Sequence, residues 1–255
     1  MKCMITAHSG CENTEWGSLE SIEKAIALNA DAIEIDVRRA PDGVLRLTHN
    51  ALSEEEYSAK VRIEEAFALI KDTNLLVNCD LKEPSTLYYV IDKSKEYGLN
   101  KDRLILTGCT SAEQLVRDPH LNDFAQIFVN LEQILKYDYF QEHKFNSVAE
   151  FLENLDEPVG RVKYEFNMDE YADRVISYCK LLGVAGLNLP YQVLTEPFAN
   201  KLNEVGILFS AWTVNDKDLA YHLLEMNPAN ITTRSVNDLL ITRAEFYERR
   251  LWNGR

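Results

Sequence analysis

Residues 4–37 read MITAHSGCENTEWGSLESIEKAIALNADAIEIDV, and this stretch divides into a strand, a helix and a second strand. Met4–His8 and Ala32–Val37 have the length and apolar composition of buried strands. Between them, apolar residues recur at helical spacing over Leu19–Asn29, and Ser18 stands where a helix N-cap belongs. A strand, a helix and a strand in this order predict a right-handed crossover between two parallel strands.

The same alternation of short apolar strands and amphipathic helices continues along the whole chain. Further strands are expected over Val44–His49, Leu75–Leu81, Leu104–Thr107, Ile127–Leu131, Gly186–Leu189, Leu208–Val214 and Asn230–Thr232. Further helices are expected over Ile63–Lys71, Ser85–Tyr97, Ala112–Asp118, Val148–Leu155, Glu170–Leu182, Glu196–Val205, Lys217–Met226 and Val236–Glu248. The pattern of Arg161–Asn167 does not distinguish a strand from a loop.

About eight strand–helix units predict an α/β protein with a closed (β/α)₈ TIM barrel, formed as a single domain over residues 1–255. The alternative is a doubly wound open sheet, which would carry a glycine-rich phosphate loop after its first strand. The residues at the end of that strand, His8-Ser9-Gly10-Cys11, do not form such a loop. The sequence therefore favours the barrel.

The chain is acidic: 27 Lys and Arg residues stand against 41 Asp and Glu residues, a formal net charge of −14 over 255 residues. A nucleic-acid-binding protein needs a basic surface, so this balance disfavours nucleic acid as a partner, and it equally disfavours an anionic membrane surface. No apolar run approaches the ~18 residues of a membrane span, so no membrane insertion is expected. The N-terminus goes directly into a strand-like run and shows no signal peptide.

The five cysteines are an odd number, and no CxxC pair occurs among them. This usage excludes a disulfide framework and a zinc knuckle, and it indicates the reduced thiols of a cytoplasmic protein. Cys11 and Cys79 lie beside the candidate site described next and are expected to be small packing residues. His120, His143 and His222 are expected to be ordinary surface or helix residues.

Carboxylates stand at the ends of two predicted strands, and in a TIM barrel the active site lies at the C-terminal ends of the strands. Glu34 and Asp36 are two residues apart, as are Asp80 and Lys82, so each pair points to one side of its strand. Three carboxylates inside a barrel would be costly without compensation, and a hard divalent cation, Mg²⁺ or Ca²⁺, removes that cost. Lys82 would then hold an anion that the metal also contacts.

Two histidines, His8 and His49, also fall at predicted strand ends and could supply a general acid and a general base near neutral pH. Each residue taken alone has a structural interpretation. Glu34 and Asp36 could form the exposed face of an edge strand, and Lys82 could lie in a solvated loop. The joint pattern over successive strand ends is what favours a catalytic site.

Three segments resemble the glycerophosphodiester phosphodiesterase family. They are AHSG at 7–10, LESIEKAIALNADAIEIDVRRAPDG at 19–43 and VLRLTHN at 44–50. The family carries an HRG, a PENT, an ExD, an HD and a later ExK, and near its end WTVN and ITDRP. AWTVN at 211–215 and ITTR at 231–234 are similar to these last two. The resemblance spans most of the chain, is dense in the first third, and implies the TIM barrel fold.

The resemblance implies a role for each candidate residue. His8 and His49 would be the acid–base pair. One divalent cation would be held by Glu34, Asp36 and Asp80, the last at a position where the family usually has Glu. Substrate would be contacted by Lys82, at the phosphate, and by Trp212, at the wall of the barrel mouth.

The sequence also departs from the family pattern. Ser9 replaces an arginine that contacts phosphate, and Arg38 and Arg39 are candidate replacements. Asn50 and Thr233 each replace an Asp, and Trp16-Gly17-Ser18 falls in the ENT position, which leaves the role of Glu12 open. Only Ala51–Lys60 separates the HN pair from the next helix, so the insertion that shapes the alcohol pocket in the family is short here.

The implied activity is metal-dependent cleavage of a small glycerophosphodiester to an alcohol and glycerol phosphate. One alternative is cleavage of the sphingomyelinase D kind, which leaves a cyclic phosphate, because Asp80-Leu81-Lys82 resembles the DxK of those enzymes. A second is a barrel that binds a phosphate ester without turning it over. A metal-dependent sugar isomerase is the weakest alternative, since the second half of the chain offers no obvious carboxylate set. The sequence does not indicate the alcohol, the oligomeric state or which histidine is the acid.

Overall fold

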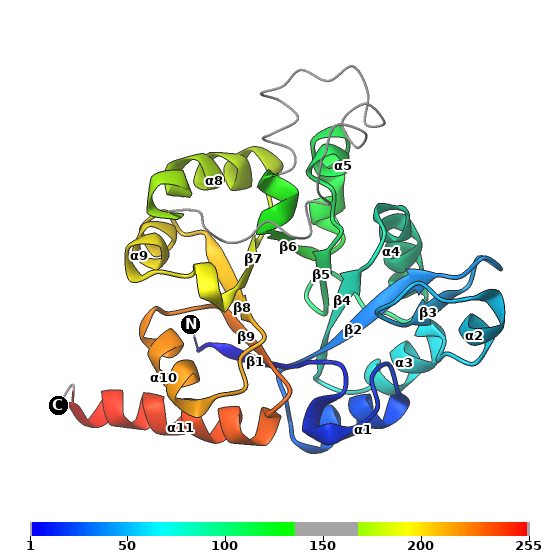
Figure 1. Ribbon diagram of the computed structural model, residues 1–255, viewed down its shortest axis with the longest axis horizontal. Helices are drawn as coiled ribbons and strands as arrows, with labels where there is room; N and C mark the ends of the chain where they lie inside the picture. The colour runs from blue at the N-terminus through cyan, green and yellow to red at the C-terminus, as the bar shows by residue number, and fades with distance from the viewer. Residues whose placement is uncertain (1, 136–167, 254–255) are drawn as a thin grey trace.

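The computed structural model describes residues 2–135 and 168–253, and these residues form a closed barrel (Figure 1). Its strands are β1 (Met4–Ala7), β2 (Ala32–Arg39), β3 (Leu45–Leu47), β4 (Leu76–Leu81), β5 (Leu104–Gly108), β6 (Gln126–Asn130), β7 (Gly186–Pro190), β8 (Leu208–Trp212) and β9 (Asn230–Thr233). They follow the order β1-β9-β8-β7-β6-β5-β4-β2-β3, and β1 also pairs with β2. All strands except β3 pair in parallel and close the eight-stranded barrel that the sequence predicts.

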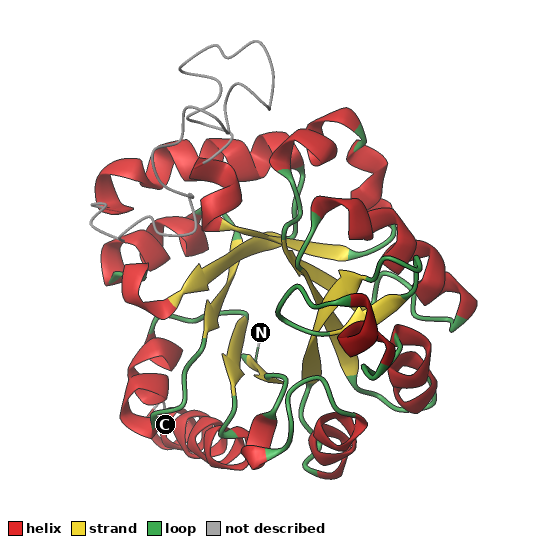
Figure 2. Cartoon of the chain, turned by 45° about the vertical axis from the view of Figure 1, so that its right-hand side comes forward, coloured by secondary structure: helices red, strands yellow, loops and turns green. Residues whose placement is uncertain are grey.

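Helices surround the strands on the outside (Figure 2). They are α1 (Leu19–Ala27), α2 (Glu54–Ser58), α3 (Ile63–Ile70), α4 (Leu87–Glu96), α5 (Ala112–Arg117), α8 (Met168–Leu182), α9 (Glu196–Glu204), α10 (Lys217–Glu225) and α11 (Val236–Asn253). The apolar core includes strand side chains such as Ile33 and Phe209 and helix side chains such as Phe67 and Phe198. As predicted, Ser18 caps α1, its side chain accepting the N–H of Ser21 at 3.2 Å.

The barrel interior is lined partly by polar side chains that satisfy one another. Thr6 donates its hydroxyl to Oδ1 of Asn230 at 2.7 Å, and both are buried. Beside them and Asn78 lies a cavity of about 10 Å³, room for about one water molecule. Because side chains two apart share a face of a strand, the rows that contain Thr6 and Asn78 continue to His8 and Asp80 at the C-terminal end.

The first and last strands close the barrel. Thr6 of β1 stands opposite Ala32 of β2 on one side and Thr232 of β9 on the other. Helix α11 packs back onto β1 at this closure, and Figure 1 shows it along the lower edge of the molecule, below α10. From α11, the buried Arg243 donates to the carbonyl oxygen of Cys3 at 2.8 Å and pairs with Asp31.

One expected strand differs from the prediction. The expected strand Val44–His49 is the short β3, which pairs antiparallel with the outer end of β2 and takes no part in barrel closure. Helix α2 was not expected. Its N-terminus is a capping box in which Ser53 and Glu56 satisfy each other's backbone N–H groups, a sequence signal that was available.

Several helix boundaries also differ from the prediction, including those of α4 and α11. The helix expected over Ser85–Tyr97 begins at Leu87, after a 3₁₀ turn at Pro84–Thr86, because Pro84 supports the start of a tight turn. Helix α11 runs to Asn253 instead of Glu248. The expected helix Val148–Leu155, the stretch Arg161–Asn167 and His143 lie outside the described residues.

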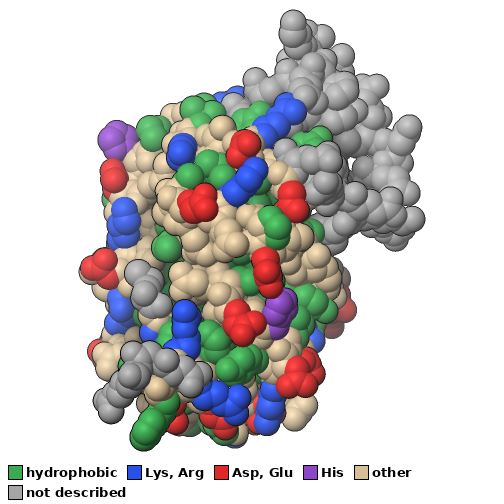
Figure 3. All heavy atoms as spheres, turned by 90° about the vertical axis from the view of Figure 1, so that its left-hand side faces the viewer, with side chains coloured by type: hydrophobic (Ala, Val, Ile, Leu, Met, Phe, Trp, Pro, Cys, Tyr) green, Lys and Arg blue, Asp and Glu red, His purple; other side chains and the backbone are tan. Residues whose placement is uncertain are grey.

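Charged and apolar side chains are interspersed on the face beside α9 and α10 (Figure 3). Acidic and basic groups alternate there, and green apolar side chains lie between them. Within residues 2–135 and 168–253, no helix is both long enough and apolar enough to cross a membrane.

Candidate functional site

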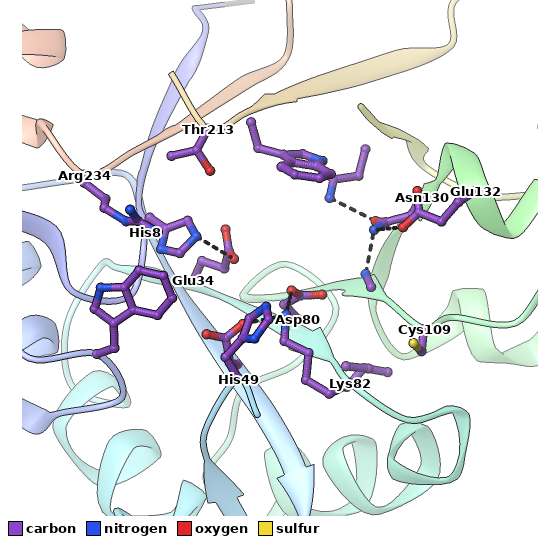
Figure 4. A pocket seen from close by; sticks show the side chains of 16 residues that line it. His8, Glu34, His49, Asp80, Lys82, Cys109, Asn130, Glu132, Thr213 and Arg234 are labelled. Atoms are coloured by element: carbon purple, nitrogen blue, oxygen red, sulfur yellow. Dashed lines mark hydrogen bonds and ion pairs between the residues drawn. The ribbon is translucent and has the colours of Figure 1, made fainter. Parts of the chain in front are cut away.

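A pocket of about 380 Å³ opens at the C-terminal end of the barrel strands. It is lined by every residue that the sequence assigned to the site: His8, Glu34, Asp36, His49, Asp80, Lys82 and Trp212 (Figure 4). The interior rows of β1, β2, β4 and β8 lead into it, because side chains two residues apart share a strand face. The barrel thus brings together residues spread over more than 200 positions of the sequence.

The three carboxylates form a compact cluster on β2 and β4. Asp36 and Asp80 stand directly opposite each other in the parallel register, and Glu34 lies two residues before Asp36. One oxygen from each of the three lies within 4.8 Å of the others. Gly108 at the end of β5 makes room for the cluster, since a Cβ there would lie 2.0 Å from Oδ1 of Asp80.

The cluster carries more negative charge than its surroundings neutralise. Burial raises the pKa of Glu34 well above its usual range, and the carboxylates of Asp80 and Asp36 raise it further. Burial also raises the pKa of Asp80, against the opposing charge of Lys82. Burial alone would lower the pKa of Lys82, but the carboxylates of Asp80 and Asp36 together raise it. The Lys82 ammonium lies 2.7 Å from Oδ1 of Asp36 and also bonds to Asp80.

This donor set fits a hard divalent cation. The cluster offers carboxylate oxygens alone, which are the ligands that Mg²⁺ and Ca²⁺ prefer. Glu34 and Asp36 are nearly completely buried, so a cation there would offset the cost of keeping them ionised. The donor set does not discriminate between the two metals.

His8 is held in one tautomer by the backbone. Its Nδ1 lies 2.8 Å from the carbonyl oxygen of Ser9, and because a carbonyl can only accept, Nδ1 carries the proton of the neutral ring. The lone pair is then on Nε2, which lies 3.8 Å from Oε1 of Glu34. Burial lowers the pKa of His8; the bond to Ser9 opposes this effect and the charge of Arg234 adds to it. The ring is therefore suited to act as a neutral base.

His49 reaches the pocket by a route that the sequence did not predict. It does not end a parallel barrel strand, because β3 runs antiparallel to β2. Instead, the hairpin returns toward the barrel, and Thr48 donates its N–H to the carbonyl oxygen of Asp36 at 3.0 Å. His49 follows at the height of the carboxylate cluster, with Nδ1 3.0 Å from Oδ1 of Asn50.

Neither arginine that we considered as a replacement for the family's phosphate contact lines the pocket. Arg38 pairs with Glu83 at 2.5 Å and donates to the carbonyl oxygen of His49 at 3.0 Å. The guanidinium of Arg39 lies over the ring of Tyr89. Both arginines are on the part of β2 that extends beyond the barrel, where alternate side chains no longer face the interior.

Polar residues of the pocket wall opposite His8 were not predicted from the sequence. Asn130 ends β6, and its Oδ1 accepts from Nδ2 of Asn188 at 2.9 Å, while its Nδ2 donates to Glu132 at 2.8 Å. Trp212, at the end of β8, also lines the pocket. Figure 4 shows Asn130 and Glu132 across the pocket from His8. The signal was available for Asn130 and Asn188, because both are polar residues at or near the ends of predicted strands.

Two residues on the His8 side were also missed, Trp16 and Arg234. The Trp16 ring centre lies 5.7 Å from that of His8 and 6.3 Å from that of His49. The guanidinium carbon of Arg234 lies 4.1 Å from the Trp16 ring centre. Glu12, whose role was open, accepts the N–H of Asn237 at 3.0 Å and supports the first turn of α11.

The remaining candidates have the structural roles that we expected. The side chains of His120 and His222 are exposed on the surface, 82% and 51% respectively. Cys11 and Cys79 are completely buried in the core, and burial raises the pKa of each thiol. Neither thiol is a candidate nucleophile.

Solved structures with a similar fold include several glycerophosphodiester phosphodiesterases. One from Parabacteroides distasonis has a TM-score of 0.67 at 16% identity, and the match covers 98% of each chain. One from Thermotoga maritima has a TM-score of 0.59 at 20% identity, covering 93% of this chain and 96% of the other. A phosphodiesterase from Oleispira antarctica, solved with its product sn-glycerol 3-phosphate, has a TM-score of 0.63 at 16% identity, covering 94% and 96%.

These likenesses establish a shared barrel fold, and they agree with the family resemblance in the sequence. No family model matches the chain. A search of curated proteins also finds no match.

Proposed function

We propose that this protein is a metal-dependent phosphodiester hydrolase that cleaves a small glycerophosphodiester to an alcohol and glycerol phosphate. The observation that carries the proposal is the cluster of Glu34, Asp36 and Asp80 in one pocket with two histidines and Lys82. The similarity to barrels that are glycerophosphodiester phosphodiesterases supports the same reaction class. We further propose that residues 1–255 form one domain and that the protein is cytoplasmic. The buried, free thiols of Cys3, Cys11, Cys79 and Cys179 support this location.

Glu34, Asp36 and Asp80 would hold one divalent cation, Mg²⁺ or Ca²⁺. When bound, such a cation acts as a Lewis acid that polarises phosphoryl oxygens. Lys82 adds a positive charge at the edge of the same cluster, where it stabilises negative charge that develops on the phosphoryl group. Trp212 forms an apolar wall for the part of the substrate that extends toward the barrel mouth.

The two histidines divide the proton transfers. His8 donates its Nδ1 proton to the carbonyl oxygen of Ser9, and its Nε2 accepts a proton from the hydroxyl of the attacking water. The hydroxyl oxygen forms a new bond to phosphorus as the bond from phosphorus to the leaving alcohol breaks. His49, which is solvent-exposed at the pocket edge, donates a proton to that alcohol oxygen.

One observation favours a second outcome at the same site. Asp80 and Lys82 bond to each other, and their spacing matches the DxK of sphingomyelinase D-like enzymes. In those enzymes a hydroxyl of the substrate itself attacks phosphorus and leaves a cyclic phosphate. Phosphorus NMR of the product separates the two outcomes, because water attack gives an acyclic monoester.

The test is phosphodiester hydrolysis with and without divalent metal. The substrates are glycerophosphocholine, glycerophosphoethanolamine, glycerophosphoglycerol and an aryl phosphodiester. We expect metal-dependent release of glycerol phosphate, abolished in Asp36→Asn. Turnover of the aryl diester alone would mean that the natural substrate lies outside this series. Silence on all four substrates, with metal binding demonstrated, would favour a barrel that binds phosphate esters without cleaving them.

The same assay tests the histidines. His8→Ala and His49→Ala are each expected to lower kcat by about 10²–10⁴-fold with a much smaller change in KM. His120→Ala is the matched control, because His120 is an exposed histidine paired with Asp123 outside the pocket, and it should retain full activity. Near-normal turnover in either pocket variant would remove that histidine from the mechanism.

A further inference from the structure

Arg234 brings a guanidinium into the pocket on the side away from Lys82. It follows β9 directly, and its backbone N–H bonds to Oδ1 of Asn215 at 2.8 Å. The parallel register places Thr233 opposite Ala7, so Arg234 comes next to His8 at the end of the neighbouring strand. Figure 4 shows the Arg234 side chain beside His8.

Within the described part of the chain, the guanidinium of Arg234 makes no ion pair or hydrogen bond with a carboxylate, although its charge opposes the rise in the pKa of Glu34. Its Nε is buried and makes no hydrogen bond there. Other arginines of this acidic protein are paired, such as Arg38 with Glu83 and Arg243 with Asp31. Arg234 therefore keeps unused N–H donors at the edge of a pocket whose other cation, Lys82, is already shared between two carboxylates.

Trp16 holds this guanidinium in place. Arg234 stacks on the Trp16 ring with its guanidinium carbon 4.1 Å from the ring centre, a cation–π distance. The ring packs so closely over Gly10 that a Cβ on that residue would lie 2.2 Å from Cδ1 of Trp16. Because the stacked arginine side chain is already ordered, it loses less conformational entropy when it binds a ligand.

Ser9 contributes to the same arrangement. Its side chain does not reach into the pocket, and its Oγ accepts the N–H of Gly17 at 2.8 Å, directly after Trp16. The residue that replaces an arginine in the family resemblance therefore anchors the loop that carries Trp16. The serine at position 9, which carries no charge, therefore helps to position the Trp16 ring on which Arg234 stacks.

We propose that Arg234, stacked on Trp16, binds non-bridging oxygens of the substrate's phosphoryl group from the His8 side and so replaces the arginine that is absent at Ser9. This inference rests on the proposed phosphodiester chemistry. A guanidinium presents paired N–H donors that match two oxygens of a phosphate, which an ammonium such as that of Lys82 cannot do. Trp16 is the positioning residue for this contact.

Calorimetric titration tests the contact directly. The protein is saturated with Mg²⁺, or in a second series with Ca²⁺, and titrated with sn-glycerol 3-phosphate and with inorganic phosphate. Arg234→Gln is expected to weaken binding of both by about tenfold or more, and Arg234→Lys by less, because it keeps the charge and loses the planar fork. Arg117→Gln removes an exposed arginine paired with Glu113 and should leave both affinities unchanged. Affinities of Arg234→Gln within about twofold of the original protein would overturn the proposal.

A double-mutant cycle tests Trp16. Trp16→Leu should weaken phosphate binding when Arg234 is present and have little effect in the Arg234→Gln background, because the ring acts through the guanidinium. Trp16→Phe, which keeps an aromatic face, should restore part of the loss and guards against a general folding defect in the leucine variant. Fully additive effects would mean that Trp16 does not position Arg234.

The failure of this inference is distinguishable from failure of the proposed function. If the protein hydrolyses glycerophosphodiesters but Arg234→Gln binds phosphate normally, the function holds and the Arg234 contact does not. If no substrate is hydrolysed but phosphate binds with a requirement for Arg234, the anion contact holds and the hydrolase does not.

Discussion

Glu34 is a carboxylate whose surroundings disfavour its charged form. Its carboxylate is buried beside Asp36 and Asp80, and these neighbours together with burial make its ionised form unfavourable in the protein without metal. A residue that only stabilised the fold would not be placed this way, because an apolar or amide side chain of similar size would cost less there. A carboxylate with such an unfavourable ionised form is expected where it serves to bind a cation.

We predict that Glu34→Gln stabilises the protein in the presence of a chelator. The pKa of Glu34 is raised in the folded state, so the folded protein holds more protons than the unfolded chain once the pH exceeds the unfolded value near 4.5, and stability falls from there as pH rises. Gln does not undergo this loss. At pH 7.5 we expect the melting temperature of Glu34→Gln to be higher by about 2–4 °C, which corresponds to about 1 kcal/mol for a chain of this length.

The difference should shrink as the pH approaches 4.5 and should reverse when a saturating divalent cation is added, because the cation binds the original site more strongly. Glu23→Gln, at an exposed position of α1, is the control and should not change the pH dependence. An original protein at least as stable as Glu34→Gln at pH 7.5 with chelator would contradict the prediction.

Much of the site could be predicted residue by residue. Glu34, Asp36 and Asp80 were found because the two-residue period of a strand fixes which side chains share a face, and this rule needs no knowledge of loops. Arg234 was not found, since its approach to the pocket depends on which strand pairs with β1 at barrel closure. Trp16 depends on a loop conformation that no periodicity encodes.

At the scale of elements, the turn between β1 and α1 controls that loop. Gly10 and Gly17 adopt left-handed conformations, with φ of 79° and 69°, and Glu12 and Asn13 also have positive φ. Residues other than glycine rarely adopt such backbone angles. The glycines at positions 10 and 17 therefore allow the chain to follow this path. The result is that Trp16 folds back over Gly10 and faces both histidines.

We predict that Gly10→Ala is more damaging than Gly98→Ala. Both glycines have positive φ, 79° and 70°, but a Cβ at Gly98 meets no atom within 4 Å, whereas one at Gly10 collides with Trp16. Gly98→Ala should cost about 1–2 kcal/mol from the backbone alone, and Gly10→Ala about 1–3 kcal/mol more from overpacking. Denaturant unfolding measures both costs. Equal losses in the two variants would show that Trp16 moves aside freely.

The element pattern also shows where prediction from sequence stops. The alternation of strands and helices predicted the parallel barrel correctly, because each unit carries its own period and its own caps. The same reasoning assigned His49 to the site for the wrong reason, since period alone does not reveal that β3 turns back antiparallel on β2. The sequence Pro41-Asp42-Gly43 is a turn signal between β2 and β3, but it does not show that the hairpin lies outside the barrel.

At the scale of the whole molecule, the barrel depends on contacts between the first and last parts of the chain. Arg243 of α11 bonds to the carbonyl oxygen of Cys3 and to Asp31, and Asp31 in turn accepts the N–H of Ile5 at 2.7 Å. These bonds tie α11 to both β1 and the start of β2. These bonds stabilise the junction of β1 and β2 at the N-terminal end of the barrel strands, opposite the end that carries the candidate pocket.

We predict that Arg243→Ala lowers the free energy of unfolding by about 2–4 kcal/mol, somewhat below the value for a fully buried pair because the side chain of Asp31 is 34% exposed. Arg117→Ala, which breaks an exposed pair with Glu113, should cost about 0.5 kcal/mol or less. Denaturant unfolding measures both. The folded fraction of Arg243→Ala should keep a normal kcat, and a large kcat loss would show that closure and pocket are coupled.

The pairing of β1 with β9 also has a consequence for the newly made chain. Thr6 of β1 and Asn230 of β9 form a hydrogen bond across 224 positions of the sequence. At ordinary translation rates, β9 is made on the order of 10–50 s after β1. During that time one edge of β1 has no partner strand and is open to association with other chains. Glu34, Asp36 and Asp80 can come together early, but His8 meets Arg234 only when the last strand arrives. The proposed site would therefore be incomplete until β9 has been made and has paired with β1.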